Sequence, residues 1–178
     1  MLENRIAMGT GRADIFSHLL GEDTESGTRF TPKQLGANAH LTVVAGTDTT
    51  ASLTANILRE LSMHSQIQEK LYAEIKQFIE ENGPLTCVNV KSLGYLQAVI
   101  DESLRLWNPV PSGVQAMTGP DGATVAGHFI PPRTVVRVPH HPLMTDARYF
   151  ADPEKFWPER WLNDRQGVKD IKAFIPFS

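Results

Sequence analysis

Cysteine is nearly absent from this sequence, and so are long apolar runs. Cys87 is the single cysteine among 178 residues, which excludes an intramolecular disulfide. No run of about 18 apolar residues occurs, so no transmembrane helix is encoded. Basic residues are not in excess, because the formal net charge is -3, and this argues against a nucleic-acid-binding module. The content of 41% hydrophobic and 21% charged residues is that of a globular chain rather than a disordered one.

Proline is scarce in the first part of the chain and frequent in the second. Of the 12 prolines, only Pro32 and Pro84 precede residue 108. Proline ends helices and is excluded from central strands. The sequence therefore predicts a helical part, residues 1–107, followed by a proline-rich part of short strands and coil, residues 108–178. The predicted fold class is mainly α with a small β-sheet.

Capping signals and apolar periodicity predict the helices of the first part. Thr31 can cap a helix whose first residue is Pro32, and Gln34 completes a capping box with Thr31. Ser65 and Gln68 form a second pattern of this kind. Together with the spacing of the apolar residues, these signals predict helices over residues 12–20, 32–63, 65–82 and 92–107.

Beyond residue 108 the sequence predicts short strands. Three β-branched or apolar runs, at residues 123–125, 127–130 and 134–138, indicate a small sheet or hairpin. The pair Asp152-Pro153 is typical of the first residues of a short turn of helix, and extended coil is expected from there to Ser178. His140 and His141 are adjacent, so on a strand they would point to opposite faces.

The segment Ala45-Gly46-Thr47-Asp48-Thr49-Thr50 lies in the middle of the long predicted helix. One interpretation is a broken helix, in which Gly46 ends one segment and Thr47 or Asp48 caps the next. The other is functional. Ala45 and Thr49 are four residues apart and share one helical face with Gly46 beside them, so a flat cofactor could approach this backbone. Thr49 would offer a hydroxyl there, and Asp48 a carboxylate.

Two further segments carry charges that could act together. Glu102 and Arg105 are three residues apart on a predicted helix, so they can form an ion pair. A solvated pair would contribute little, but the apolar neighbours of this pair favour partial burial, in which both charges need further partners. In the aromatic segment 156–161, Arg160 could complete the network, since one carboxylate can accept bonds from more than one guanidinium.

Several common sites are not encoded. No spacing of His, Cys and Asp matches a zinc site. The chain has no Walker-type loop, no Gly-x-Ser-x-Gly and no Gly-x-Gly-x-x-Gly, which disfavours nucleotide binding and serine hydrolysis.

In this order and spacing, these segments resemble the C-terminal half of a cytochrome P-450, a haem-thiolate monooxygenase of the eukaryotic microsomal type. The resemblance covers nearly the whole chain. Residues 45–49 resemble the oxygen-activation motif of the family's long helix, and Glu102-x-x-Arg105 resembles the pair on its K helix. Residues 127–136 resemble the small sheet that follows, and residues 156–161 resemble the segment that supplies Arg160 to a Glu-Arg-Arg triad.

The resemblance implies a cofactor and roles for the residues. Haem would be the cofactor, with Ala45, Gly46 and Thr49 beside it, and Asp48 and Thr49 would deliver protons to dioxygen. Glu102, Arg105 and Arg160 would be structural. The family's axial cysteine would fall six residues beyond Ser178, so no residue of the chain is expected to ligate the metal, and the chain alone is expected to be inactive.

The resemblance also implies partners. Electrons would come from NADPH through NADPH-cytochrome P-450 reductase, and the substrate would be a small apolar molecule. No nucleic acid is expected as a partner. The parent protein would sit at the endoplasmic reticulum membrane through an N-terminal anchor that this chain does not include. Two departures from the family pattern are Ala116, where many members have an arginine that reaches a haem propionate, and Met144-Thr145, where many have His-Arg.

Two alternatives remain open at this point. The chain could be a non-enzymatic helical protein that acts by binding a partner through exposed helix faces. It could also be a fragment of an interrupted gene with no function as written.

Overall fold

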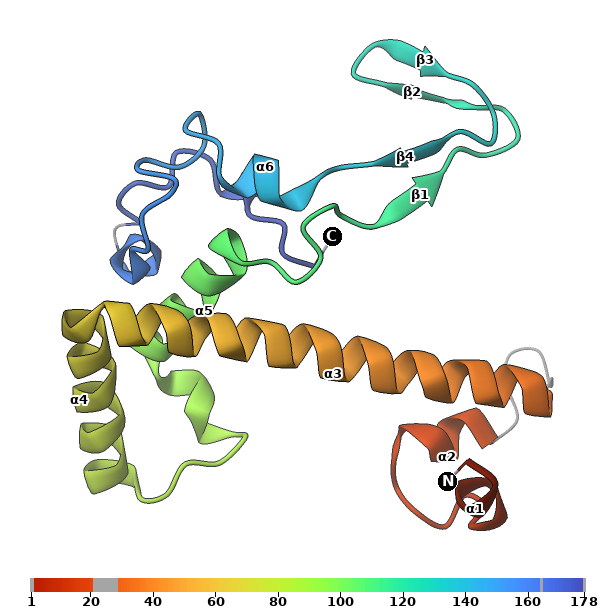
Figure 1. Cartoon of the computed structure of the whole chain (residues 1–178), viewed down its shortest axis with the longest axis horizontal. Helices are drawn as coiled ribbons and strands as arrows, with labels where there is room; N and C mark the ends of the chain where they lie inside the picture. The colour runs from red at the N-terminus through yellow and green to blue at the C-terminus, as the bar shows by residue number, and fades with distance from the viewer. Residues whose placement is uncertain (1, 21–28, 164, 178) are drawn as a thin grey trace. The chain divides into compact units, whose positions relative to one another are not determined.

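A computed structural model describes residues 2–20, 29–163 and 165–177. The chain divides into two compact units, residues 1–50 and 51–178, and the boundary lies within one long helix, α3. Helices dominate up to residue 107, and all four strands follow it (Figure 1). Within the described residues, no helix is long and apolar enough to span a membrane.

The first unit contains two short helices and the first part of α3. Helix α1 (Leu2–Ala7) was not predicted, and α2 (Ile15–Leu20) is the helix predicted over 12–20. Asp14 joins them: it accepts two bonds from Arg5, at 3.1 and 2.6 Å, and a bond from the Ser17 backbone at 2.9 Å, which caps α2. The bond from Arg5 lowers the pKa of the Asp14 carboxyl, against the opposing effect of burial.

Helix α3 (Pro32–Met63) has the bounds that the sequence predicts. The capping box is formed, because the Thr31 N–H donates to Gln34 Oε1 at 2.8 Å and the Gln34 N–H donates to Thr31 Oγ1 at 3.3 Å. The helix continues through Gly46 without a break. The broken-helix interpretation of residues 45–50 is therefore wrong, since a single glycine costs only about 1 kcal/mol in a helix interior.

The next two helices pack together in the second unit. The capping box predicted for Ser65 is wrong, because α4 (Ser65–Asn82) has no side-chain cap. The backbone carbonyl of His64 accepts its first bonds instead. Helix α5 (Gly94–Leu106) starts two residues later than predicted, after a 3-10 turn, η1 (Asn89–Ser92). Its first turn is capped across space by Glu74 of α4, which accepts bonds from the Tyr95 and Leu96 N–H groups at 2.7 and 2.9 Å.

The strands form two antiparallel pairs. Strand β2 (Ala123–Val125) pairs with β3 (His128–Ile130), with Val125 opposite His128. Their turn, Ala126-Gly127, has φ of 49° and 82°, which is typical of the tight turns that match strand twist. Strand β1 (Gln115–Met117), which was not predicted, pairs with β4 (Val135–Arg137), with Ala116 opposite Val136.

The last part of the chain departs most from the prediction. His140 and His141 open a short helix, α6 (His140–Met144), instead of lying on a strand. Asp152 has a φ of 42° and forms a hydrogen-bonded turn with Lys155, so no helix starts there. Two 3-10 turns, η2 (Pro158–Trp161) and η3 (Ile171–Ala173), lie in the segment predicted to be extended coil.

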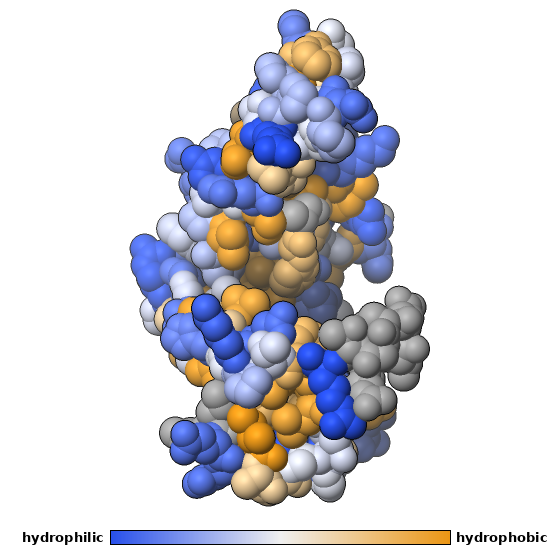
Figure 2. Space-filling view, turned by 90° about the vertical axis from the view of Figure 1, so that its right-hand side faces the viewer, coloured by the Kyte–Doolittle hydropathy of each residue, from blue (hydrophilic) through white to orange (hydrophobic). Residues whose placement is uncertain are grey.

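The apolar core lies in the second unit, between α4, α5 and the segment before η2. It contains Leu71, Tyr95, Val99, Leu106 and Phe156. Other apolar residues stay outside it: Figure 2 shows hydrophobic residues open on the surface between hydrophilic ones.

Candidate functional site

Glu102 and Arg105 form a fully buried ion pair on α5. Arg105 Nε donates to Glu102 Oε2 at 3.0 Å, and Arg105 Nη2 donates to Glu102 Oε1 at 2.9 Å. Both side chains have 0% exposure. The bidentate geometry is possible because residues three apart share a helical face. The solvated surface pair considered from the sequence is therefore not what forms.

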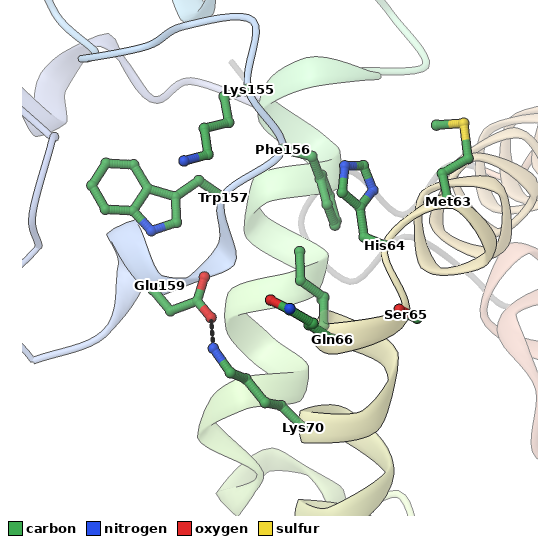
Figure 3. A pocket seen from close by; sticks show the side chains of 10 residues that line it. Met63, His64, Ser65, Gln66, Lys70, Lys155, Phe156, Trp157 and Glu159 are labelled. Atoms are coloured by element: carbon green, nitrogen blue, oxygen red, sulfur yellow. Dashed lines mark hydrogen bonds and ion pairs between the residues drawn. The ribbon is translucent and has the colours of Figure 1, made fainter.

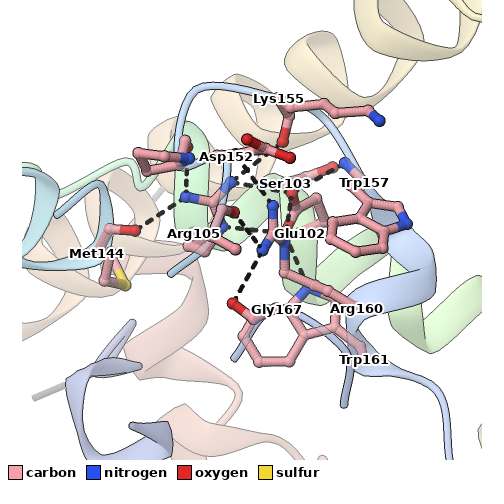
Figure 4. Close-up of polar contacts among 12 residues, drawn as sticks. Glu102, Ser103, Arg105, Met144, Asp152, Lys155, Trp157, Arg160, Trp161 and Gly167 are labelled. Carbon is pink, nitrogen blue, oxygen red and sulfur yellow. Dashed lines mark hydrogen bonds and ion pairs between the residues drawn. The ribbon is translucent and has the colours of Figure 1, made fainter. Parts of the chain in front are cut away.

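Glu102 also holds the segment that contains η2 (Figure 4). Arg160 Nε donates to Glu102 Oε1 at 3.1 Å, and the Arg160 side chain is likewise fully buried. The backbone N–H of Trp157 and the indole N–H of Trp161 each donate to Glu102 at 2.9 Å. One carboxylate thus accepts five hydrogen bonds, three of them from a segment more than 50 residues away.

The two arginines use their remaining N–H groups to hold backbone carbonyls. Arg105 donates to the carbonyls of Met144 and Pro153 at 2.9 and 2.7 Å. Arg160 donates to those of Ala151 and Asp152 at 2.9 and 3.2 Å. Backbone groups in an irregular segment have few partners of their own. The network therefore gives the coil between α6 and η2 a defined conformation.

Charge in this network is not balanced, because two guanidiniums face one carboxylate. Burial lowers the pKa of Arg160, and Arg105 lowers it further, while Glu102 opposes both effects. Cation–π interactions also stabilise the two guanidiniums. That of Arg105 lies 5.2 Å from the centroid of the Phe150 ring, and that of Arg160 lies 5.0 Å from the centroid of the Trp157 ring. Removing one member of such a network costs about 3–5 kcal/mol.

A more exposed pocket of about 630 Å³ lies beside the network, where α3 turns into α4 (Figure 3). Its polar rim includes Glu159, which pairs with Lys70 and accepts a bond from the Tyr95 hydroxyl at 2.9 Å. Burial raises the pKa of Tyr95, and Glu159 raises it further. Burial also pushes the pKa of Glu159 upward, but Lys70 and Tyr95 outweigh it, so the net change is downward.

The other predicted site residues lie on α3, in the unit of residues 1–50. Ala45, Gly46 and Asp48 are exposed, and Thr49 is half-buried. The Thr49 hydroxyl donates to the Ala45 carbonyl at 2.6 Å. A Cβ placed on Gly46 meets no atom within 4 Å, so this face of the helix is open. The residues therefore share one accessible stretch of a continuous helix, as their spacing predicts.

A mainly apolar cavity of about 610 Å³ lies at the paired strands and was not predicted from the sequence. Of its polar lining residues, His140 is only 2% exposed, and its Nδ1 has no hydrogen-bond partner among the residues that the structure describes. Its position was missed because the histidines were assigned to a strand. The full lining is Val114, Ala116, Val125, Ile130, Val136, Arg137, Val138, His140 and Ile175.

Metal-ligating side chains do not gather in the part of the chain that the structure describes. No group of three or more His, Cys, Asp or Glu residues there could hold a metal ion. Cys87 is exposed, in the connection between α4 and η1.

The structure combines a mainly helical fold, two short antiparallel strand pairs and a fully buried Glu-Arg-Arg network. The family model of cytochrome P-450 matches residues 3–178. The chain belongs to the cytochrome P-450 family.

Several similar proteins come from fungi. Cytochrome P-450 monooxygenase aclL of Aspergillus oryzae is 37% identical over 175 residues, which are 98% of this chain and 35% of the relative. Cytochrome P-450 67 of Uromyces fabae is 37% identical over 171 residues, 96% of this chain and 30% of the relative. Cytochrome P-450 monooxygenase atr2 of Stereocaulon alpinum is 36% identical over 179 residues, 99% of this chain and 35% of the relative. The chain spans about a third of the length of these relatives.

Proposed function

We propose that this chain is the oxygen-activation and scaffold part of a haem-dependent monooxygenase, which inserts one oxygen atom into a small apolar organic substrate. The observation that carries the proposal is the saturated, buried network of Glu102, Arg105 and Arg160 in a chain of this family. The names of two of these relatives support the reaction class, since both are called monooxygenases.

Haem is the cofactor that the family implies, and the cavity at the paired strands suits it. A porphyrin is a flat apolar ring with two carboxylates, and this cavity combines apolar walls with one buried imidazole that lacks a partner. Val114, Ala116 and Ile175 would contact the ring. When bound, haem supplies the redox chemistry of its iron.

On α3, Asp48 and Thr49 are proposed to move protons toward the reacting oxygen. The Thr49 hydroxyl already has a partner in the Ala45 carbonyl, so it can accept a bond through its free lone pairs or rotate away and donate elsewhere. The exposed Asp48 carboxylate can exchange protons with water. Ala45 and Gly46 would leave room for the cofactor, because neither carries a side chain beyond Cβ.

The network is proposed to position the chain that leads toward the haem ligand. Asn108, two residues after the end of α5, donates to the Pro176 carbonyl at 2.9 Å, so the segment that follows α5 also holds the chain near its last described residues. By resemblance, this segment precedes the cysteine loop. NADPH-cytochrome P-450 reductase is the proposed electron donor.

Carbon monoxide tests the proposal directly. We expect the 178-residue chain, supplied with haem and reduced, to lack the absorption band of thiolate-ligated haem, because by resemblance the cysteine ligand would fall beyond Ser178. The native transcript, sequenced across the Ser178 codon, should continue in frame to a cysteine, and the extended protein should show that band. A thiolate-type band from the 178 residues alone would contradict the assignment, and so would an extended protein that binds no haem.

Exposed apolar side chains favour a second candidate, a partner-binding helical protein. Leu41 and Val43 on α3 are 63% and 65% exposed, and Met117 and Phe129 on the strands are both 65% exposed. Such residues mark surfaces that other polypeptide covers. A stable monomer that unfolds cooperatively and does not bind haem would favour this candidate over the enzyme.

A further inference from the structure

His140 is a buried histidine without the hydrogen bonds that buried polar groups normally have. It is the first residue of α6, and its side chain is enclosed while that of its neighbour His141 is exposed. Its Nδ1 is buried, and no described residue forms a hydrogen bond with it. More than nine in ten buried polar groups are paired, and an unpaired one lowers the stability of the fold. A role in packing alone therefore does not explain a histidine here, since leucine would fill the space without that cost.

The surroundings of His140 indicate which ligand its ring could bind. The cavity wall has seven apolar residues, one histidine and one formally charged residue, Arg137. Arg137 makes no ion pair with any residue that the structure describes. With a cation, an N–H donor and no acid in the lining, the site favours an anion that is carried on an apolar body.

We propose that His140 donates a hydrogen bond to the carboxylate of an apolar carboxylic acid bound in this cavity, with Arg137 adding positive charge. Under the proposed function, on which this source of the acid rests, the carboxylate is a haem propionate. An acyl chain with a carboxylate head carries the same chemistry and is the other possible source. His140 is thus a positioning residue that sets where the acid group lies, without taking part in the reaction.

The experiment compares acids with an ester on the full 178-residue chain. Haem and haem dimethyl ester are titrated by absorbance, and dodecanoate by calorimetry, against the wild type, His140→Leu, His140→Gln and the matched control His141→Leu. We expect the wild type to bind haem about tenfold more tightly than the ester. His140→Leu should remove this preference, His140→Gln should keep part of it, and His141→Leu should leave it unchanged.

A second readout separates binding from packing. Without ligand, His140→Leu should unfold at an equal or higher urea concentration than the wild type, because it removes an unpaired buried group. Lower stability combined with equal loss of acid and ester binding would show a packing role and overturn the inference. If His140→Leu fails to fold, the inference is overturned as well, because His140 then has a structural role. Any preference of the wild type for acid over ester would then have to come from other residues of the cavity.

The outcomes distinguish this inference from the proposed function. Tight haem binding without a preference for acid over ester would leave the haem assignment intact and overturn the role of His140. Binding of dodecanoate that depends on His140, without haem binding, would support the carboxylate site and contradict haem as its occupant. Binding of neither would overturn both.

Discussion

The network around Glu102 and the segment 45–50 of α3 use polar side chains in opposite ways. Glu102 is fully buried and accepts five hydrogen bonds, so it has little freedom to react. Asp48 is exposed, and the Thr49 hydroxyl donates to a carbonyl of its own helix. A saturated buried group stabilises a fold, whereas an open hydroxyl or carboxylate can exchange protons. The first region is therefore built as a scaffold, and under the proposed function the second region is the one that moves protons.

The largest effect is expected at the centre of the network. Glu102→Gln removes the negative charge between two buried guanidiniums and turns two acceptor positions into donors. We expect the free energy of unfolding to fall by about 3–5 kcal/mol, measured by urea titration.

The matched control is Glu80→Gln on α4, where the carboxylate is 65% exposed and lies 3.9 Å from Lys76. This variant should unfold within error of the wild type. If Glu102→Gln behaves like Glu80→Gln, the network is not what stabilises the second unit.

A smaller effect is expected where α4 caps α5. Glu74→Ala leaves the Tyr95 and Leu96 N–H groups without their acceptor. The loss of this cap should cost about 1–2 kcal/mol of unfolding free energy. Glu69→Ala, an exposed position on the same helix, is the control and should be neutral. Equal urea midpoints for the two variants would show that water replaces the cap.

On α3 we expect a substitution that raises stability and, under the proposed function, weakens haem binding. Gly46→Ala adds a methyl group in open space within a continuous helix, so helicity and stability should rise by up to about 1 kcal/mol. Ala51→Gly, further along the same helix, should produce the reverse change. If this face approaches haem as proposed, Gly46→Ala should also weaken haem binding in the extended protein. Unchanged haem affinity would place the cofactor elsewhere.

The smallest expected effect is the pH dependence of stability that comes from Glu159, on the rim of the pocket between α3 and α4. The pKa of Glu159 lies below its ordinary value of 4.5 in the folded protein, so its charge stabilises the fold above pH 4.5. That contribution is lost as the pH falls through the lowered pKa. The difference in unfolding free energy between the wild type and Glu159→Gln should therefore shrink from pH 6 to pH 3.

Lys70→Gln tests the cause of this pKa shift. The variant should remove most of the pH dependence that Glu159 contributes, because Lys70 supplies the partner charge. The ion pair of Glu159 with Lys70 would be contradicted if the difference in unfolding free energy between the wild type and Glu159→Gln stayed constant with pH or grew on acidification.

Local rules predicted the helices well and the last third of the chain poorly. The capping box at Thr31 predicted the start of α3 correctly. Its end was predicted correctly from the pattern at Ser65, although the capping box expected there does not form. The start of α5 was predicted too early, because its cap comes from Glu74 on another helix and no local pattern contains it. In the coil after α6, the turn of helix predicted at Asp152-Pro153 is wrong, since the conformation of this segment depends on the two arginines that bind its carbonyls.

In the site, too, local features could be predicted from the sequence, whereas long-range contacts could not. The sequence by itself determined the long helix, the spacing of Asp48 and Thr49, and the pairing of Glu102 with Arg105, because these depend on residues within one or two helical turns. Only the tertiary structure decided that Glu102 also binds Trp161 and that His140 is buried while His141 is not. Burial and long-range hydrogen bonds depend on which segments pack together, and neighbours in the sequence do not carry that information.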